Sequence, residues 1–353
     1  MRSLPVVSLP AFGKCLLKTP LIPSTMILIF FERFYPRHRK DVFGMNEPLK
    51  LRRTVVNGAL GAVGQALVRA LLDRGVETWA LCYPTDPRIC HLPSKAHIIK
   101  LDMRDVERLP ELIPGGADAF FHLAWMGTIG PNRDNALIQT ENIRCAVLAA
   151  ETAKALGCGV FVGAGSQAEH GRIEGLVTAD APCFPTTGYG IAKLCAGQLT
   201  RLACSRLELR HVWARILSAY GPGGDTLSVI PTMLAKLTRG EKPSLTAGEQ
   251  QWDFCYTSDV AEALICMAES GRPGAVYPVG YGKTRMLREY FEVIRDAVDP
   301  SLPLGIGELP YPPNQVMHLQ ADLTPLREDT GFEPKVPFEE GIRLTLEAYR
   351  KGN

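Results

Sequence analysis

The stretch Thr54-Val55-Val56-Asn57-Gly58-Ala59-Leu60-Gly61-Ala62-Val63-Gly64-Gln65-Ala66-Leu67-Val68 places a short β-branched run before three glycines spaced by three. An amphipathic pattern follows and continues to about Asp73, so the order predicts a strand, a tight turn and a helix. Gly58 permits the turn, Gly61 lets the backbone approach a pyrophosphate, and Gly64 lets the helix pack closely on the strand. Free amides and the dipole at the helix N-terminus would then hold phosphates. We therefore predict a dinucleotide site here rather than an ordinary glycine-rich loop.

Strand and helix patterns alternate from residue 54 onward, which is typical of a parallel sheet covered on both faces. The further strands predicted are a run ending at Leu81-Cys82, then residues 97–101, 119–124, 159–165 and 211–217; a long helix is predicted at 134–156. The predicted fold class is α/β, a doubly wound Rossmann sheet with a smaller C-terminal substrate-binding lobe. We assign residues 45–217 to the sheet domain and 218–353 mainly to the lobe, interleaved with the first.

Three polar residues follow in an order that suggests chemistry. Ser166 stands at the carboxyl end of the fifth predicted strand, the sheet edge where ligands of open α/β sheets bind. Tyr189 and Lys193 lie four residues apart and so project from one face of a helix. An ammonium close to the phenol is expected to lower the pKa of Tyr189, which could then exchange a proton with a carbonyl or alcohol while a hydride moves elsewhere. Taken alone, the pair also fits a solvated helix face and Ser166 a turn-capping hydroxyl.

Composition limits the class of protein. Of 353 residues, 46% are hydrophobic and 22% charged, as in ordinary soluble enzymes. Lys and Arg number 39 against 37 Asp and Glu, so the net charge of +2 gives no basis for a nucleic-acid partner. The ten cysteines form no CxxC pair, which suggests neither a zinc site nor a disulfide framework and favours a reducing, cytoplasmic setting.

The first 44 residues differ from the rest. They are rich in proline and contain the apolar run Met26-Ile27-Leu28-Ile29-Phe30-Phe31. A membrane span needs about 20 residues, and no small-residue cleavage site follows the run, so we expect neither a span nor a signal peptide. We favour a disordered extension before Met45, added by an early choice of start codon, over a membrane-surface tether.

With these residues in place, the chain resembles an extended short-chain dehydrogenase/reductase of the NAD-dependent epimerase/dehydratase family, from about residue 54 to residue 349. The resemblance rests on the glycine turn, on Asp102, on His122-Leu123-Ala124, on Ser166, Tyr189 and Lys193, on Tyr220-Gly221-Pro222 and on Val260-Ala261. It implies that Tyr189 is the general acid/base, that Lys193 lowers its pKa and bonds the nicotinamide ribose, and that Ser166 holds the substrate oxygen. The cofactor contacts that it implies are Gly58, Leu60, Gly61, Ala62, Val63, Gly64, Asp102, Met103, Leu123, Ala124, Tyr189 and Lys193; no metal is implied.

The chain departs from the family where dehydratases carry an acid for eliminating water. The matching position is Ala168, preceded by Gln167. An alanine cannot move a proton, so ketone reduction, alcohol oxidation or epimerisation through a keto intermediate remain. His170 stands where the family often has a tyrosine; we favour a structural role over a substrate-facing one.

Cofactor choice depends on the end of the second strand. An acid there would bind the adenosine ribose and favour NAD, but Cys82 occupies the position. The missing carboxylate modestly favours NADP over NAD. Arg88 is either a ligand of the 2′-phosphate or a solvated loop residue.

Relatives that act on nucleotide-sugars hold the diphosphate with arginines and an asparagine. Here Trp252 stands in the place of an arginine and Ser218 in the place of the asparagine. The usual clamp is depleted unless Arg215, Arg239 or Lys242 substitutes. The stretches 251–256 and 310–315 are predicted to be substrate loops.

Within the family the chain resembles the deoxysugar 4-ketoreductases, which implies a reductase acting on a 4-keto nucleotide-sugar. A nucleotide-sugar 4-epimerase that retains NAD is the alternative, and a catalytically silent dinucleotide sensor is a third hypothesis. A homodimer through the helices around Asn142 and Tyr189 is implied by the resemblance only. The sugar, the nucleotide and the stereochemical outcome stay open.

Overall fold

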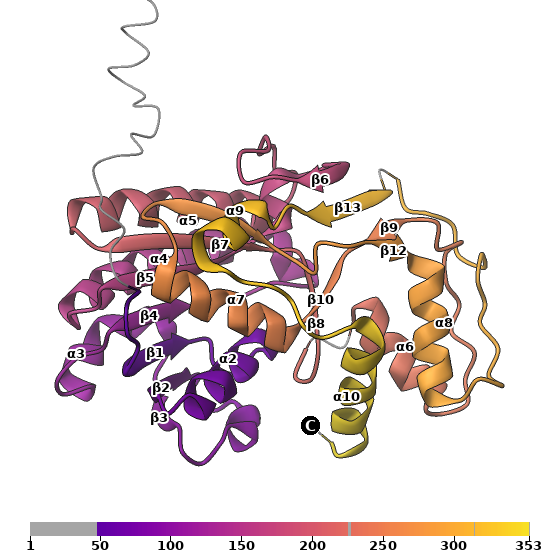
Figure 1. Cartoon of the computed structure of the whole chain (residues 1–353), viewed down its shortest axis with the longest axis horizontal. Coiled ribbons are helices and arrows are strands. Elements are labelled where there is room, and N and C mark those ends of the chain that lie inside the picture. The colour runs from indigo at the N-terminus through magenta and orange to yellow at the C-terminus, as the bar shows by residue number, and fades with distance from the viewer. Residues whose placement is uncertain (1–47, 225–226, 314, 353) are drawn as a thin grey trace, which may run out of the picture. The chain divides into compact units, whose positions relative to one another are not determined.

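The computed structural model describes residues 48–224, 227–313 and 315–352. Its centre is a parallel sheet of seven strands in the order β11-β7-β5-β4-β1-β2-β3 (Figure 1). The strands are β1 (Arg53–Asn57), β2 (Glu77–Cys82), β3 (His97–Lys100), β4 (Ala119–His122), β5 (Val160–Ser166), β7 (Arg210–Ile216) and β11 (Ala275–Val279). The predicted doubly wound α/β fold is confirmed. The predictions made for residues 1–44 lie outside the described residues.

Successive side chains of the strands point to opposite faces of the sheet and contribute to two separate hydrophobic cores. Val56, Phe121 and Val162 pack on one face with α2 (Ala62–Asp73) and α7 (Thr257–Ser270). Val55, Phe120 and Phe161 pack on the other with α4 (Ala136–Ala155) and α5 (Gly188–Arg206). Such two-sided burial explains why these strands read as continuous apolar runs rather than as alternating ones.

The predicted elements match the observed ones to within two residues at each end. The helix predicted at 134–156 begins at Ala136, because the side chain of Asn135 accepts hydrogen bonds from the amides of Leu137 and Ile138. Gly157, with φ of 76°, follows its C-terminus. The strand predicted at 119–124 ends earlier, at His122, so Leu123 and Ala124 belong to the loop beside the glycine turn.

A smaller lobe is formed mainly by the C-terminal part of the chain. It contains α6 (Val229–Leu237), α8 (Leu287–Val298) and α10 (Phe338–Arg350), whose apolar faces share one core with the strands β8 (Ser218–Tyr220) and β10 (Phe254–Tyr256). A second sheet has the order β12-β9-β13-β6, with β12 (Arg285–Met286), β9 (Gln251–Trp252), β13 (His318–Ala321) and β6 (Gly175–Val177).

The chain crosses between the two parts more than once. Strand β6 comes from the first half of the sequence but pairs with β13, and β11 comes from the second half but pairs with β7 in the main sheet. The short helices α3 (Leu109–Leu112) and α9 (Thr324–Thr330) complete the α-helices of the described chain.

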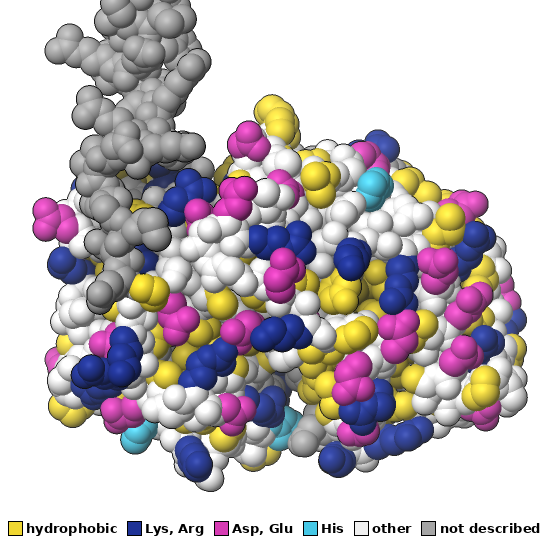
Figure 2. Space-filling model, in the orientation of Figure 1, with side chains coloured by type: hydrophobic (Ala, Val, Ile, Leu, Met, Phe, Trp, Pro, Cys, Tyr) yellow, Lys and Arg dark blue, Asp and Glu magenta, His cyan; other side chains and the backbone are white. Residues whose placement is uncertain are grey.

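Basic and acidic side chains are interspersed over the face of the molecule shown in Figure 2. Within residues 48–224, 227–313 and 315–352, no helix is both long enough and apolar enough to cross a membrane.

Candidate active site

The glycine turn predicted from the sequence connects β1 to α2. Gly58 has φ of 95°, and a Cβ atom there would lie 2.4 Å from the amide nitrogen of Ala124. A Cβ atom on Gly64 would lie 2.2 Å from the carbonyl oxygen of Gly58. Gly61 is the N-cap of α2 and contributes no side chain that could bond the first amides of the helix. Positions 58 and 64 therefore accept only glycine, and the free amides of the turn suit the pyrophosphate of a dinucleotide.

The other predicted cofactor contacts lie around this turn. The amides of Leu123 and Ala124 both donate to the carbonyl oxygen of Asn57, at 2.8 and 2.9 Å, and so bring the loop after β4 against Gly58. Leu60, Ala62 and Val63 form the turn and the first turn of α2.

Asp102 follows the outer strand β3. It is the N-cap of the 3-10 turn η2 (Met103–Arg108), and its carboxylate accepts hydrogen bonds from the amide and the guanidinium of Arg104. These bonds hold the pKa of Asp102 below its usual range. Asp102 and Met103 thus lie at the carboxyl edge of the sheet, two strands away from the glycine turn.

The loop after β2 bears on the choice between NAD and NADP. Arg88 donates from Nε and Nη2 to the carboxylate of Asp86, at 3.0 and 2.6 Å. The cation suggested for a 2′-phosphate is therefore already paired with an acid. Cys82 is buried, and this burial raises the pKa of its thiol to about 11.

Ser166, Tyr189 and Lys193 meet at the carboxyl end of β5. Thr187 caps α5 by accepting a hydrogen bond from the amide of Gly190, which places Tyr189 in the first helical turn and Lys193 in the next. Lys193 Nζ donates to the carbonyl oxygen of Ala164 at 2.7 Å and lies 3.7 Å from the ring centroid of Trp125. The serine and the tyrosine line a common cavity, and the lysine is buried beside them.

Burial has the largest effect on the pKa values of both Tyr189 and Lys193. Burial raises the pKa of Tyr189, while the hydrogen bond with Ser166 and the charge of Arg133 act in the opposite direction. Burial also lowers the pKa of Lys193 to about 7. The net fall in the pKa of Tyr189 expected from the sequence is not found, because burial of the phenol outweighs the groups that favour its ionised form.

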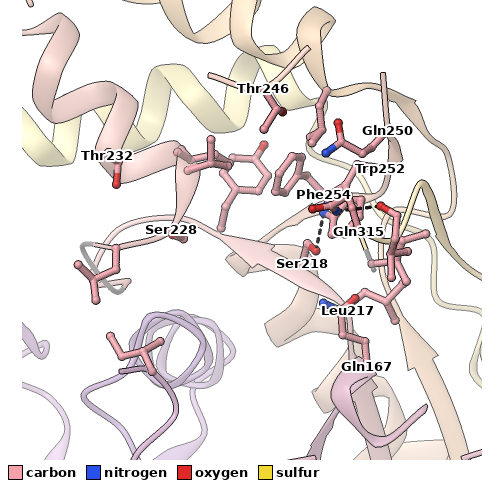
Figure 3. Close-up of a pocket in the computed structure, with 18 of the residues that line it drawn as sticks. Gln167, Leu217, Ser218, Ser228, Thr232, Thr246, Gln250, Trp252, Phe254 and Gln315 are labelled. Atoms are coloured by element: carbon pink, nitrogen blue, oxygen red, sulfur yellow. Dashed lines mark hydrogen bonds between the residues drawn. The ribbon is translucent and has the colours of Figure 1, made fainter. Parts of the chain in front are cut away.

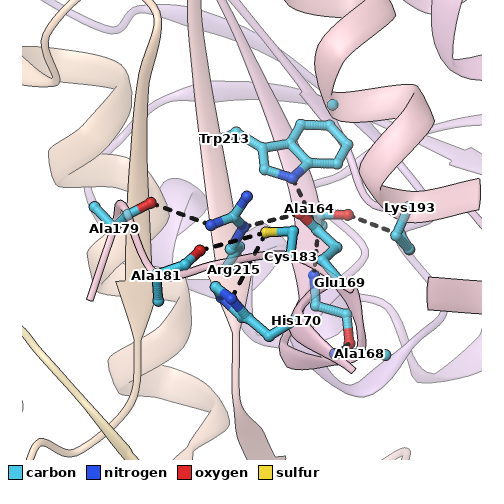
Figure 4. Close-up of polar contacts among 12 residues, drawn as sticks. Ala164, Ala168, Glu169, His170, Ala179, Ala181, Cys183, Lys193, Trp213 and Arg215 are labelled. Atoms are coloured by element: carbon cyan, nitrogen blue, oxygen red, sulfur yellow. Dashed lines mark hydrogen bonds and ion pairs between the residues drawn. The ribbon is translucent and has the colours of Figure 1, made fainter. Parts of the chain in front are cut away.

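A buried ion pair between Glu169 and Arg215 holds the backbone of Ser166, and it was not predicted from the sequence. Glu169 Oε1 accepts hydrogen bonds from the amide of Ser166 at 2.8 Å and from Trp213 Nε1 at 3.0 Å. Glu169 Oε2 accepts one from Arg215 Nε at 2.8 Å, and the two side chains are 1% and 5% exposed (Figure 4). The signal was present, since Ser166 and Glu169 have the spacing of a capping box, and the structure shows both of its bonds.

His170 belongs to the same buried region. Its Nδ1 lies 3.0 Å from the carbonyl oxygen of Pro182 and 3.6 Å from Cys183 Sγ. Burial lowers the pKa of the imidazole. These contacts are with the protein interior and agree with the structural role favoured from the sequence.

A cavity of about 900 Å³ opens beside Ser166 and Tyr189 and extends into the smaller lobe (Figure 3). Its wall includes parts of both predicted substrate loops, namely Trp252, Phe254 and Gln315. No aspartate or glutamate stands among the described residues that line it, and Arg133 and Lys236 are the cations there. The other polar side chains of the wall are hydroxyls and amides, including Thr128, Gln167, Thr186, Thr187, Ser218, Ser228, Thr232, Ser244, Thr246 and Gln250.

The residues proposed to replace the diphosphate clamp do not reach this cavity. Arg215 is held by Glu169, Arg239 pairs with Glu241, and Lys242 pairs with Glu308. Trp252 Nε1 donates to Ser218 Oγ at 2.8 Å, so the two positions of the usual clamp are bonded to each other (Figure 3). The proposal that Arg215 substitutes for the clamp is therefore wrong, because its guanidinium is consumed by a buried ion pair.

Known proteins are similar in sequence to this chain. A dTDP-glucose 4,6-dehydratase of Streptomyces niveus is 27% identical over 84% of this chain and 93% of its own length. A dTDP-D-glucose 4,6-dehydratase of Mus musculus is 28% identical over 48% of this chain and 50% of its own length.

Solved structures share the fold. A UDP-N-acetylglucosamine 4-epimerase from Methanobrevibacter ruminantium M1 superposes with a TM-score of 0.77 at 24% identity, covering 86% of this chain and 99% of its own. A UDP-glucose 4-epimerase from Thermus thermophilus, solved with NAD, gives 0.75 at 23% identity, over 85% and 100% of the two chains. The sequence profile of the NAD dependent epimerase/dehydratase family matches residues 54–280, from the start of β1 to the end of the main sheet. This chain therefore belongs to the NAD dependent epimerase/dehydratase family of enzymes.

Proposed function

We propose that this enzyme is an NAD(P)-dependent reductase that reduces the 4-keto group of a nucleotide-activated sugar or deoxysugar, with Tyr189 as the proton donor. The observation that carries the proposal is the wall of the cavity at its catalytic end. Ser166 and Tyr189 are present there, whereas Ala168, preceded by Gln167, stands where dehydratases have an acid. Eliminating water needs a carboxylate that moves a proton, but reducing a ketone needs only one proton donor.

The described side chains then have distinct parts in the reaction. The Ser166 hydroxyl donates a hydrogen bond to the substrate carbonyl oxygen and orients it. The reduced nicotinamide, when bound, supplies a hydride to the carbonyl carbon. Tyr189 transfers its phenolic proton to the oxygen, so that the ketone becomes an alcohol and the tyrosine becomes a phenolate. Lys193 is proposed to bond the nicotinamide ribose.

The cofactor is proposed to lie on Gly58, Gly61 and Gly64. A missing carboxylate at Cys82 favours NADP(H). Two observations count for NAD(H): Arg88 is already paired with Asp86, and NAD is present in solved relatives of the same fold. The second candidate function, a 4-epimerase that retains NAD, is supported by the same two observations.

A homodimer in the cytoplasm is proposed as the working form. Large apolar side chains on the outer surfaces of α4 and α5 are exposed, namely Leu137, Ile191, Leu199 and Leu202. Burying such side chains against a second copy would stabilise a four-helix interface.

The first test is to denature the purified protein and identify any nucleotide that it releases by chromatography. An empty protein that binds NADPH better than NADH supports the reductase, and stoichiometric NAD supports the epimerase. A protein that binds neither contradicts the proposal.

The second test uses Tyr189→Phe. We expect turnover of 4-keto nucleotide-sugars to fall by about 10²- to 10⁴-fold while cofactor affinity is kept, since only the proton donor is lost. A fully active variant would exclude Tyr189 as the donor.

A further inference from the structure

Tyr189 lies beside two cations, and the nearer one is not the lysine of the predicted pair. The guanidinium carbon of Arg133 lies 4.4 Å from the ring centroid of Tyr189, whereas Lys193 Nζ lies at 5.8 Å. Arg133 comes from η3 (Pro131–Asp134), in the loop between β4 and α4. It also lines the cavity, unlike the lysine.

The loop is fixed to the helix that carries the tyrosine. Asp134 Oδ1 accepts a hydrogen bond from the amide of Gly188 at 2.7 Å, next to Tyr189. Arg133 Nη1 donates to the carbonyl oxygen of Thr128 at 2.6 Å, and the side chain of Gln139 donates to the carbonyl oxygen of Asn132 at 3.1 Å. Arg133 makes no ion pair with a residue of the described chain, so its charge is not neutralised by a neighbouring acid.

Lys193 is poorly placed to stabilise the phenolate of Tyr189 by itself. Its ammonium donates to Ala164 and packs on Trp125. Because burial lowers its pKa to about 7, only part of the population carries the charge at neutral pH. A guanidinium, in contrast, stays protonated throughout the working range of an enzyme.

We propose that Arg133 is a positioning residue of the reaction, whose guanidinium stabilises the phenolate of Tyr189 and sets the pH range over which the tyrosine transfers its proton. The reductase role rests on the proposed function, but the effect on the phenol does not. The other groups that act on the phenol are the Ser166 hydroxyl, which lowers its pKa, and Glu169, which raises it. Two further ionisable groups are near, namely Lys193, 5.8 Å from the ring centroid, and Asp134, bonded to the amide of Gly188. Glu169 opposes the phenolate, and its charge is matched by Arg215.

The test measures the ionisation of Tyr189 directly, without substrate or cofactor. Protein labelled with [ζ-¹³C]tyrosine is titrated by NMR, and the Tyr189 signal is identified by its loss in Tyr189→Phe. Arg133→Gln should move the onset of ionisation upward by about one pH unit or more, since an opposite charge at this distance favours the charged form. Arg133→Lys keeps a positive charge and should restore most of the shift.

A matched control is Arg144→Gln, which removes an exposed arginine of α4 that pairs with Glu141. It should leave the Tyr189 titration unchanged. Unchanged titration in Arg133→Gln, or an equal shift in the lysine and glutamine variants, would overturn the proposal, because either result means that the charge does not act on the phenol. Thermal unfolding of each variant shows that the compared proteins are folded.

Turnover supplies a second readout. In the direction of alcohol oxidation, the tyrosine must be ionised, so Arg133→Gln should move the rising limb of the pH profile of kcat to higher pH by the same amount. A shift in the titration without any turnover of nucleotide-sugars would contradict the proposed function and leave the inference about Arg133 intact. Turnover of nucleotide-sugars with an unmoved pH profile in Arg133→Gln would support the proposed function and contradict the inference about Arg133.

Discussion

Replacing Glu169 by glutamine removes a buried negative charge while keeping the shape of the side chain. In the wild type the carboxylate accepts three hydrogen bonds, from the amide of Ser166, from Trp213 Nε1 and from Arg215 Nε. The variant keeps one oxygen for the first two donors. Its NH2 group, however, replaces the oxygen that accepted the hydrogen bond from Arg215, so two donors face each other. The charge of Arg215 is then left without a partner in the protein interior.

Burial, rather than distance, decides how much the loss of an ion pair lowers the free energy of unfolding. Glu340 and Arg343 on α10 approach to 2.7 Å, close to the 2.8 Å of Glu169 and Arg215, but their side chains are 44% and 53% exposed. For the exposed pair, Glu340→Gln should leave the free energy of unfolding nearly unchanged, because water solvates the exposed Arg343, which also keeps its ion pair with Glu347. For the buried pair, Glu169→Gln should lower the free energy of unfolding by about 3–5 kcal/mol, because water cannot replace the lost partner.

The assay is urea unfolding at pH 7, followed by tryptophan fluorescence, on both glutamine variants, on Arg215→Met and on Glu169→Gln combined with Arg215→Met. The double variant should recover about 2 kcal/mol or more, because it removes the unpaired charge as well. A change for Glu169→Gln as small as that of the surface control would refute the reasoning. So would a double variant whose cost equals the sum of the two single ones, since the cycle then shows no coupling.

Three further predictions concern other parts of the structure. Gly64→Ala should weaken NADH binding by about 100-fold in a fluorescence titration, because the new Cβ would lie 2.2 Å from the carbonyl oxygen of Gly58 and displace the turn; unchanged affinity would argue against the turn as the dinucleotide site. Lys193→Met should have a higher free energy of unfolding than the wild type at pH 7. This difference should shrink as the pH rises toward about 10, because the unfolded lysine keeps a proton that the folded lysine, with its pKa of about 7, has released. Equal pH slopes of the unfolding free energy in the two proteins would contradict this prediction. Leu202→Glu on α5 should shift the protein from dimer to monomer in light scattering, whereas a mass that is the same before and after substitution would count against the proposed interface.

The sequence was sufficient to predict the main sheet because each strand is buried on both faces. Runs such as Phe120 and Phe121 therefore stand out against the helices that follow them. The glycine turn was predictable for a similar reason, since its spacing reflects close backbone contacts within one β-α unit. Local patterns of this kind depend on neighbours in the chain.

What could not be predicted depends on partners distant in sequence. Arg215 was a reasonable candidate for a substrate ligand until the structure placed Glu169, 46 residues earlier, against it. The pKa of Tyr189 failed as a prediction because the spacing to Lys193 gives orientation but not burial. Arg133 was not considered, since no local pattern marks a loop arginine that reaches a helix more than 50 residues later.

Strand β6 connects the segment that follows Ser166 to the smaller lobe. It begins nine residues after Ser166 and pairs in parallel with β13 of the smaller lobe, which also contacts β9 beside Trp252. The turn that carries the serine is thus tethered at one end to the main sheet and at the other to the lobe that forms much of the cavity. A displacement of the smaller lobe would therefore be transmitted through the pairing of β6 and β13 to the segment that follows Ser166.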